Sequence, residues 1–482
     1  MTTLALERSQ PPTPTAAETS PPAPWALAGL SLATLLAALG TSSANVSLPA
    51  LSRAFGATFG EVQWVVLAYL LSVTALIVGV GRLADIVGHR RSLLAGIVVF
   101  TAASVACGLA PSLWPLVAAR AIQGIGAAAM MAVTLGLVGA VVPTDRRGRA
   151  MGLLGTMSAV GTALGPSLGG MLIAAFDWQA VFLINVPLGS MAFLLVLQHV
   201  PSGERSAPAE ASRFDLPGTG LLALTLAAYA LAVTLGRGNF GWLNLTLLAL
   251  AGGLGALFLF AESKAPSPLV QLTLLRDRGL RTGLVTSGLV ATVIMTTLVV
   301  GPFYLSLVLG LGAAAVGLVL SLGPLVAAFT GVPAGRLVDR LGARRVTLAG
   351  LTGVAGAAVA LALLPTRFGL AGYVVPLVLL TASYALFQTA NNTAVLHGVA
   401  AGRRGVVSGL LNLSRNLGLV TGASVMGALF ALGAGTTDLA AAPAPAVAAG
   451  LRITFATAAA LVGLALVLAL RESTQSSPVP VN

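Results

Sequence analysis

The sequence predicts an all-α membrane protein that crosses the bilayer fourteen times, and three observations support this. Hydrophobic residues make up 57% of the 482 positions and charged residues only 8%, whereas a soluble domain carries about 25% charged residues. Apolar segments of about 20 residues, the length that spans a bilayer, recur along most of the chain. The basic residues gather in every second gap between these segments. The composition excludes a water-soluble domain and also a disordered chain, which needs low hydrophobicity and high charge.

Fourteen apolar segments, separated by charges, prolines and glycines, are the expected spans. The stretch 282–335 contains no charged residue and no histidine, so it must hold two spans, with a turn near Gly310, Leu311 and Gly312. The fourteen expected spans are 25–48, 61–81, 92–110, 113–141, 150–176, 179–199, 216–236, 242–261, 282–309, 313–335, 346–364, 370–396, 405–433 and 449–470.

The distribution of arginine gives the expected orientation. With both termini inside the cell, 20 of the 26 Lys and Arg residues lie on the cytoplasmic side and only four lie on the outer side. Such an excess is the positive-inside signal of membrane proteins. We therefore expect a multi-pass protein of the inner (plasma) membrane with both termini cytoplasmic. The polar tails 1–24 and 471–482 are expected to be disordered.

A segment at the end of the second span recurs at the end of the tenth. Gly81 to Arg91 reads GRLADIVGHRR and Gly335 to Arg345 reads GRLVDRLGARR, with seven of eleven positions identical. Parallel halves of this kind are common in secondary transporters. The expected division is a six-helix bundle over 25–199, a linker with two extra spans over 200–281, and a second six-helix bundle over 282–470.

The repeated segment is interpreted as a gating motif. Its glycines permit a tight turn, its aspartates can pair with an arginine or cap a helix, and its arginines meet the anionic inner leaflet. The residues assigned to the motif are Gly81, Arg82, Asp85, Gly88, Arg90, Arg91 and Asp339.

Several stretches together resemble the major facilitator superfamily, and in particular its fourteen-span branch of drug:proton antiporters. Besides the repeated segment, Leu116 to Gly126 resembles the family signature of the fourth span, and Gly161 to Gly170 resembles the fifth-span signature of exporters. Trp178 to Gly189 and Gly405 to Gly422 resemble elements of the sixth and thirteenth spans of that branch. The resemblance implies the major facilitator fold, in which two six-helix bundles rock around a central cavity.

The first span departs from the family pattern. Asn45 and Pro49 match it, but Gly40 stands where the branch usually carries an aspartate. In relatives that carboxylate is linked to the handling of protons and cationic drugs, so this chain lacks the acid that serves both there.

Two arginines fall within spans, where an unpaired charge costs at least about 2.5 kcal/mol. By the resemblance, Arg120 couples protons or contacts an anion; the alternative is a structural tie to backbone carbonyls of a neighbouring helix. Arg415 shares a helix face with Asn412 and Asn416, and this face either lines a pocket or gate or ties the helix to its neighbours. None of the 14 acidic residues falls at mid-membrane, so the interior is expected to be positive.

Neutral polar residues in the spans are the candidates for contact with substrate. Four of them, between positions 384 and 392, follow helical spacing on one stripe of the twelfth span. The alternative for each is hydrogen bonding between helices. The six candidates are Asn45, Gln123, Tyr384, Gln388, Asn391 and Asn392.

The fifth span combines small residues with a proline. We interpret these residues as a helix bend that favours the export cycle, and close packing of small residues against a neighbouring helix is the alternative. They are Gly161, Gly165, Pro166, Gly169 and Gly170.

No other chemistry is indicated. The single cysteine, Cys107, lies in an apolar run and the three histidines are scattered, so neither a disulfide nor a metal site is expected. The sequence has no phosphate-binding loop of an ATP-driven pump and no catalytic constellation. We therefore expect no enzyme activity, no cofactor and no nucleic-acid partner.

The expected function is secondary active export of small organic or amphipathic compounds, of the multidrug-efflux type, by a proton-coupled monomer. The alternative is an exporter or uniporter of a neutral or anionic metabolite that has no acidic proton carrier in the first span.

Overall fold

The computed structural model describes residues 24–142, 147–201, 215–234, 241–265, 276–363, 365–397, 404–436, 438–439 and 441–475. Within them the secondary structure is helical, and fourteen segments are long and apolar enough to cross a membrane. The predicted all-α fold with fourteen spans is confirmed. The predicted disordered tails lie outside the described residues, except that the first helix begins at Pro24 and the last continues to Gln475.

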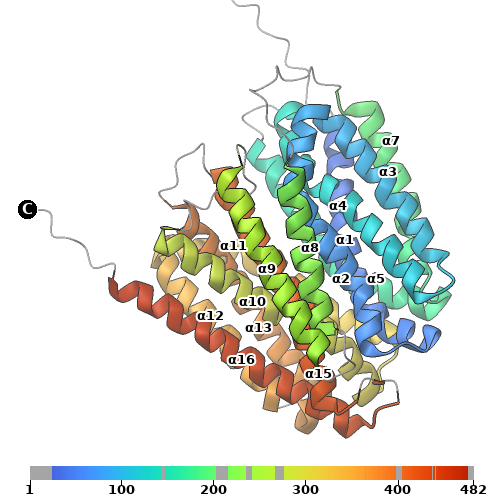
Figure 1. Cartoon of the computed structure of the whole chain (residues 1–482), viewed down its shortest axis with the longest axis vertical. Coiled ribbons are helices and arrows are strands. Elements are labelled where there is room, and N and C mark those ends of the chain that lie inside the picture. Colours follow the sequence, from blue (N-terminus) through green and yellow to red (C-terminus); the bar gives the residue numbers. More distant parts are fainter. Residues whose placement is uncertain are drawn as a thin grey trace, which may run out of the picture.

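The first six spans form one bundle (Figure 1). The sixth span is broken at Ile184, and Pro187 lies in the first turn of the helix that follows, where its missing N–H is tolerated. The helices are α1 (Pro24–Phe55), α2 (Phe59–Val87), α3 (His89–Gly108), α4 (Leu113–Val141), α5 (Arg147–Phe176), α6 (Ala180–Leu183) and α7 (Asn185–His199).

The last six spans form the second bundle, and two short π-helices interrupt it. The first follows Pro302, which removes a backbone donor and crowds the preceding turn. The elements are α10 (Arg278–Phe303), η3 (Tyr304–Val308), α11 (Ala313–Leu341), α12 (Ala343–Leu363), α13 (Pro365–Leu396), α14 (Arg404–Thr421), η5 (Gly422–Met426), α15 (Gly427–Ala434) and α16 (Ala444–Gln475). The expected turn between the ninth and tenth spans is present, with Gly310 at φ 65°.

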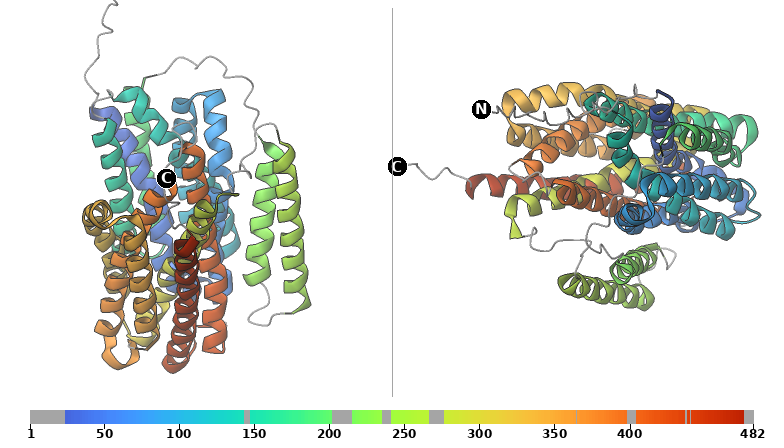
Figure 2. Two further views of the ribbon diagram at one scale, coloured as in Figure 1. Left: turned by 90° about the vertical axis from the view of Figure 1, so that its left-hand side faces the viewer. Right: turned by 90° about the horizontal axis from the view of Figure 1, so that it is seen from above.

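The two extra spans, α8 (Leu216–Thr234) and α9 (Trp242–Lys264), pair with each other on one side of the molecule, outside both bundles (Figure 2). The α8 helix contacts α2 and the end of α14, where the Tyr229 hydroxyl donates to Thr421 Oγ1 over 3.2 Å. The α9 helix is largely exposed, and Trp242 and Phe260 are 80% and 56% accessible. A lipid-facing outer helix accounts for these exposed apolar side chains.

The repeated segment forms the same turn in both halves. Gly88 lies between α2 and α3 at φ 103°, and Gly342 lies between α11 and α12 at φ 83°. Residues with a Cβ rarely adopt this backbone conformation, which accounts for glycine at the same position of both copies.

Because fourteen spans alternate in direction, α1 begins and α16 ends on the same face, called here the terminus side; the other face is the far side. On the far side the bundles meet through aromatic packing. The ring of Phe59 in α2 lies 4.9 Å from Phe303 and 5.5 Å from Phe430, both in the second bundle. Gln63 of α2 also donates to the Ala423 carbonyl over 2.8 Å. These contacts hold the two bundles together on the far side, which is called the closed side below.

The glycines of the fifth span lie at close helix contacts. A Cβ on Gly161 would lie 2.5 Å from the Leu35 carbonyl oxygen of α1, and one on Gly169 would lie 2.9 Å from Val46 Cγ1. Toward the second bundle, a Cβ on Gly317 of α11 would collide with the Pro166 carbonyl oxygen. These contacts match the close-packing interpretation, and α5 runs as one helix through Pro166. A bend that favours export remains a prediction.

Replacing Gly317 with alanine is expected to force α5 and α11 apart, because the new methyl group meets the rigid backbone at Pro166. Spin labels at Phe176 and Asp438, exposed far-side positions in different bundles, should then report a longer distance. Gly331→Ala on the same helix is the control, since no atom lies within 4 Å of its added Cβ. Identical distance distributions for both variants and wild type would contradict this account of the closed side.

Candidate functional site

A cavity of about 360 Å³ lies between the two bundles. Helices α1 and α5 of the first bundle form one wall, and α10, α11, α13 and α14 of the second form the other. Its polar lining comes mostly from hydroxyl groups, and its apolar lining includes Met295, Leu320 and Leu377. A mixed lining with a few polar groups is typical of sites for small organic ligands.

Three residues predicted from the sequence line this cavity. Tyr384 and Gln388 lie one turn apart on α13, and Arg415 lies opposite them on α14. The Arg415 side chain lies close to the Tyr384 hydroxyl, and its Nε is buried with no hydrogen-bond partner in the described part of the chain. The lining residues include no Asp or Glu, so Arg415 is the charged group of the cavity.

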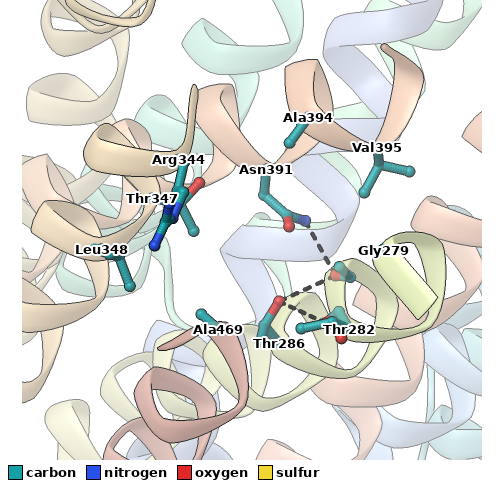
Figure 3. A pocket seen from close by; sticks show the side chains of 11 residues that line it. Gly279, Thr282, Thr286, Arg344, Thr347, Leu348, Asn391, Ala394, Val395 and Ala469 are labelled. Atoms are coloured by element: carbon teal, nitrogen blue, oxygen red, sulfur yellow. Dashed lines mark hydrogen bonds between the residues drawn. The ribbon is translucent and has the colours of Figure 1, made fainter. Parts of the chain in front are cut away.

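The remaining polar candidates near the cavity point elsewhere. Asn391 donates to the Gly283 carbonyl over 3.1 Å and borders a different pocket (Figure 3). Asn392 and Asn412 are exposed, and Asn416 is buried. The expected shared face around Arg415 therefore divides, and only Arg415 itself lines the cavity.

Arg120 lies inside the first bundle and outside the cavity lining. Its side chain is 1% exposed and donates to the carbonyl oxygens of Val65 on α2 (2.8 Å) and Gly40 on α1 (3.1 Å). The guanidinium also lies 4.3 Å from the ring centroid of Tyr69, a distance at which cation and ring attract. This arrangement joins three helices and corresponds to the structural tie that the sequence left open.

Gln123 and Asn45 are also buried within the first bundle. Gln123 accepts from Arg120 and donates to Ser104 Oγ over 2.7 Å. Asn45 donates to the Thr41 and Ser42 carbonyls of its own helix. Both side chains are fully buried and neither lines the cavity, so contact with substrate at these two residues remains a prediction.

The gating motif is only partly described. Arg90 donates to the Leu197 carbonyl on α7, whereas Arg91 and Asp339 are exposed. The side chains of Arg82 and Asp85 lie outside the described part of the structure. Gly81 lies within α2 and has room for a Cβ, with Ala132 Cβ at 3.8 Å.

Sequence reasoning missed the hydroxyl residues of the cavity. They are Thr41, Ser42, Ser158, Thr162, Thr297 and Thr381. Such residues give little signal because their hydroxyls usually bond to the carbonyl one turn earlier, as Thr162 does to Ser158 and Thr381 does to Leu377. Helical spacing alone would have extended the Tyr384–Gln388 stripe to Thr381.

Arg120→Ala is expected to destabilise the protein, because it leaves two buried carbonyl oxygens without their donor and opens a void. Each buried acceptor left without its donor costs about 1–3 kcal/mol, so the unfolding temperature of the purified protein should fall clearly. Arg53→Ala is the control, since among the described residues this exposed arginine bonds only to Pro49 of its own helix. An Arg120→Ala protein with wild-type thermal stability would show that the tie is not structural.

Several known proteins are similar in sequence to most of this chain. The multidrug resistance protein Stp of Mycobacterium tuberculosis (strain CDC 1551 / Oshkosh) is 34% identical over 391 residues, which cover 80% of this chain and 72% of Stp. The riboflavin transporter RibZ of Clostridioides difficile (strain 630) is 28% identical over 396 residues, 82% of this chain and 86% of RibZ.

Solved structures agree on the fold. A crystal structure of a bacterial homologue of the human lysosomal transporter Spinster, in an inward-facing and occupied conformation, superposes with a TM-score of 0.71 at 17% identity over 96% of this chain and all of that one. The family model described as Major Facilitator Superfamily matches residues 30–423. With fourteen spans in two bundles and an outer pair, the chain belongs to the major facilitator superfamily of membrane transporters, as the resemblance in its sequence predicted.

Proposed function

We propose that the protein exports small organic or amphipathic compounds across the inner (plasma) membrane by alternating access, as a monomer with cytoplasmic termini. The observation that carries this proposal is the cavity of about 360 Å³ that both bundles line. Because each bundle supplies one wall, rocking the bundles would expose the same cavity first to one side and then to the other. The closed far side corresponds to the loading state of such an exporter, in which compounds enter from the terminus side.

The relatives support export of drug-like compounds. Stp is named as a multidrug resistance protein and is 34% identical over most of this chain. The largely apolar cavity lining with scattered hydroxyls suits compounds of varied shape, because few fixed polar groups have to be matched.

We propose the proton gradient as the energy source. Arginine is effectively always protonated, so Arg120 and Arg415 would influence coupling through their positive field and not by carrying the proton. The described residues that line the cavity include no Asp, Glu or His, and this proposal assigns no proton carrier there.

Everted membrane vesicles test both parts of the proposal. Substrate uptake, measured with a compound library, should depend on an imposed pH gradient and fall several-fold when an ionophore collapses it. Uptake that is unchanged after the gradient is collapsed would contradict proton coupling but not transport itself. Vesicles that accumulate no library compound above empty controls would contradict export itself.

A second candidate function is export or uniport of a neutral or anionic metabolite. The specific observation in its favour is Arg415, whose buried Nε has no partner in the described part of the chain. An acceptor or anion on the substrate would satisfy this donor. RibZ, a relative at 28% identity, is named as a riboflavin transporter.

Arg415→Gln distinguishes the two candidates. A hydrogen bond to a charged group contributes about 1.5–3 kcal/mol, so transport of anionic compounds should fall roughly tenfold or more while transport of cationic dyes is maintained. Arg367→Gln removes the same charge from an exposed position and should leave both unchanged. An equal loss for anionic and cationic compounds would contradict a role for Arg415 in reading substrate charge.

A further inference from the structure

A second cavity, of about 180 Å³, lies within the C-terminal bundle near the terminus side, apart from the central cavity. Four helices surround it: α10, α12, α13 and α16. Figure 3 shows the side chains ringed about this space, with Arg344, Thr347 and Leu348 of α12 across from Thr282 and neighbouring residues of α10. Neither the family resemblance nor the proposed transport cycle uses this cavity.

The cavity holds a cation and hydroxyl groups without partners. The guanidinium of Arg344 and the side-chain hydroxyls of Thr282 and Thr347 make no hydrogen bond or ion pair within the residues that the structure describes. By contrast, Thr286 and Asn391 on the same wall are bonded to backbone carbonyls of α10. Arg344 is exposed and the two threonines are half-buried, so all three donors are open to a ligand that enters this space and carries several acceptor atoms.

The internal repeat provides an independent comparison. Arg90 and Arg344 occupy the same position in the two copies of the repeated segment. In the first half, Arg90 is used internally, because it donates to the Leu197 carbonyl at the end of α7 over 2.6 Å. In the second half, Arg344 makes no such bond to any residue that the structure describes, and it borders an open space next to Ala469 of α16. The second copy thus keeps the arginine and leaves its hydrogen bonds available.

The surroundings favour an anion with an apolar part. No acidic residue lines the cavity, and Asp277, the nearest acid along α10, caps the helix by accepting from Leu280 N. Leu348, Val395 and Ala469 supply an apolar wall. A group that combines phosphate oxygens with hydrocarbon satisfies both walls.

We propose that this cavity binds the phosphate group of an anionic phospholipid from the leaflet on the terminus side, with Arg344 as the charged contact and Thr282 and Thr347 as hydroxyl donors. Basic pockets between transmembrane helices on the cytoplasmic side are suited to such headgroups. The proposal does not depend on what the central cavity transports. A soluble phosphate shares the same chemistry, and the experiment separates the two sources.

Native mass spectrometry of the purified full-length protein, titrated with phosphatidylglycerol, measures the affinity of the most tightly bound lipid. Arg344→Ala should weaken this binding about fivefold to tenfold, which corresponds to about 1–1.4 kcal/mol. Arg345→Ala is the matched control, because it removes the same charge from the next residue of α12, which does not line the cavity. It should change binding by less than about twofold, below about 0.4 kcal/mol. Thr347→Val keeps the charge and should weaken binding in the same direction by a smaller factor.

Three results would overturn the proposal. Equal losses in Arg344→Ala and Arg345→Ala would reduce the effect to general surface charge. Binding of phosphatidylcholine with the same affinity and the same dependence on Arg344 would remove the preference for an anionic headgroup. Thermal stabilisation of the delipidated protein by inorganic phosphate, lost in Arg344→Ala and not increased by phosphatidylglycerol, would assign the cavity to a soluble anion.

Discussion

The structure depends on one constraint: hydrocarbon offers no hydrogen-bond partner, so the backbone must be satisfied within the protein and a buried polar side chain is costly unless it finds a partner there. Arg120 is the most demanding case because it carries a full charge at 1% exposure. Its donors reach backbone carbonyls of α1 and α2 as well as the Gln123 side chain of its own helix. The charged side chain that made this residue conspicuous in the sequence therefore holds three helices together.

The same constraint determines how the helices meet. Lipid is as apolar as a leucine side chain, so burial gives little drive for helix association and close packing must supply it. Gly161 against Leu35 within the first bundle and Gly317 against Pro166 between the bundles are contacts that no larger residue fits. Such contacts are made by backbone and small side chains, so separating the bundles on one side, as the proposed transport cycle requires, would break few side-chain hydrogen bonds.

The sequence was sufficient for the spans and the repeat, and insufficient for the direction of individual side chains. Hydropathy predicted fourteen spans because length and composition are properties of each segment alone. The glycine shared by the two repeats predicted the turns at Gly88 and Gly342, because a positive φ is a property of the local backbone. Whether Arg120 or Arg415 faces the cavity depends on how each helix is oriented about its axis relative to neighbours that are distant in sequence. Residue spacing along one helix does not determine this orientation. Spacing grouped Asn412 with Arg415, but only Arg415 lines the cavity.

The positions of Arg120 and Arg415 show which charges line the cavity of a chain that has glycine in place of aspartate at position 40. The Gly40 carbonyl accepts a hydrogen bond from Arg120 inside the first bundle. Because Arg120 does not line the cavity, it adds no positive charge to the cavity lining. Arg415, in contrast, faces the cavity from the second bundle with Nε unsatisfied. In the proposed transport function, recognition of charge would therefore belong to the wall that α13 and α14 form, and the first bundle would contribute hydroxyl groups and shape. If the bundles rock as proposed, a bound anion would keep its contact with the second bundle and exchange its contacts with the first, which would let one cavity load on one side and release on the other.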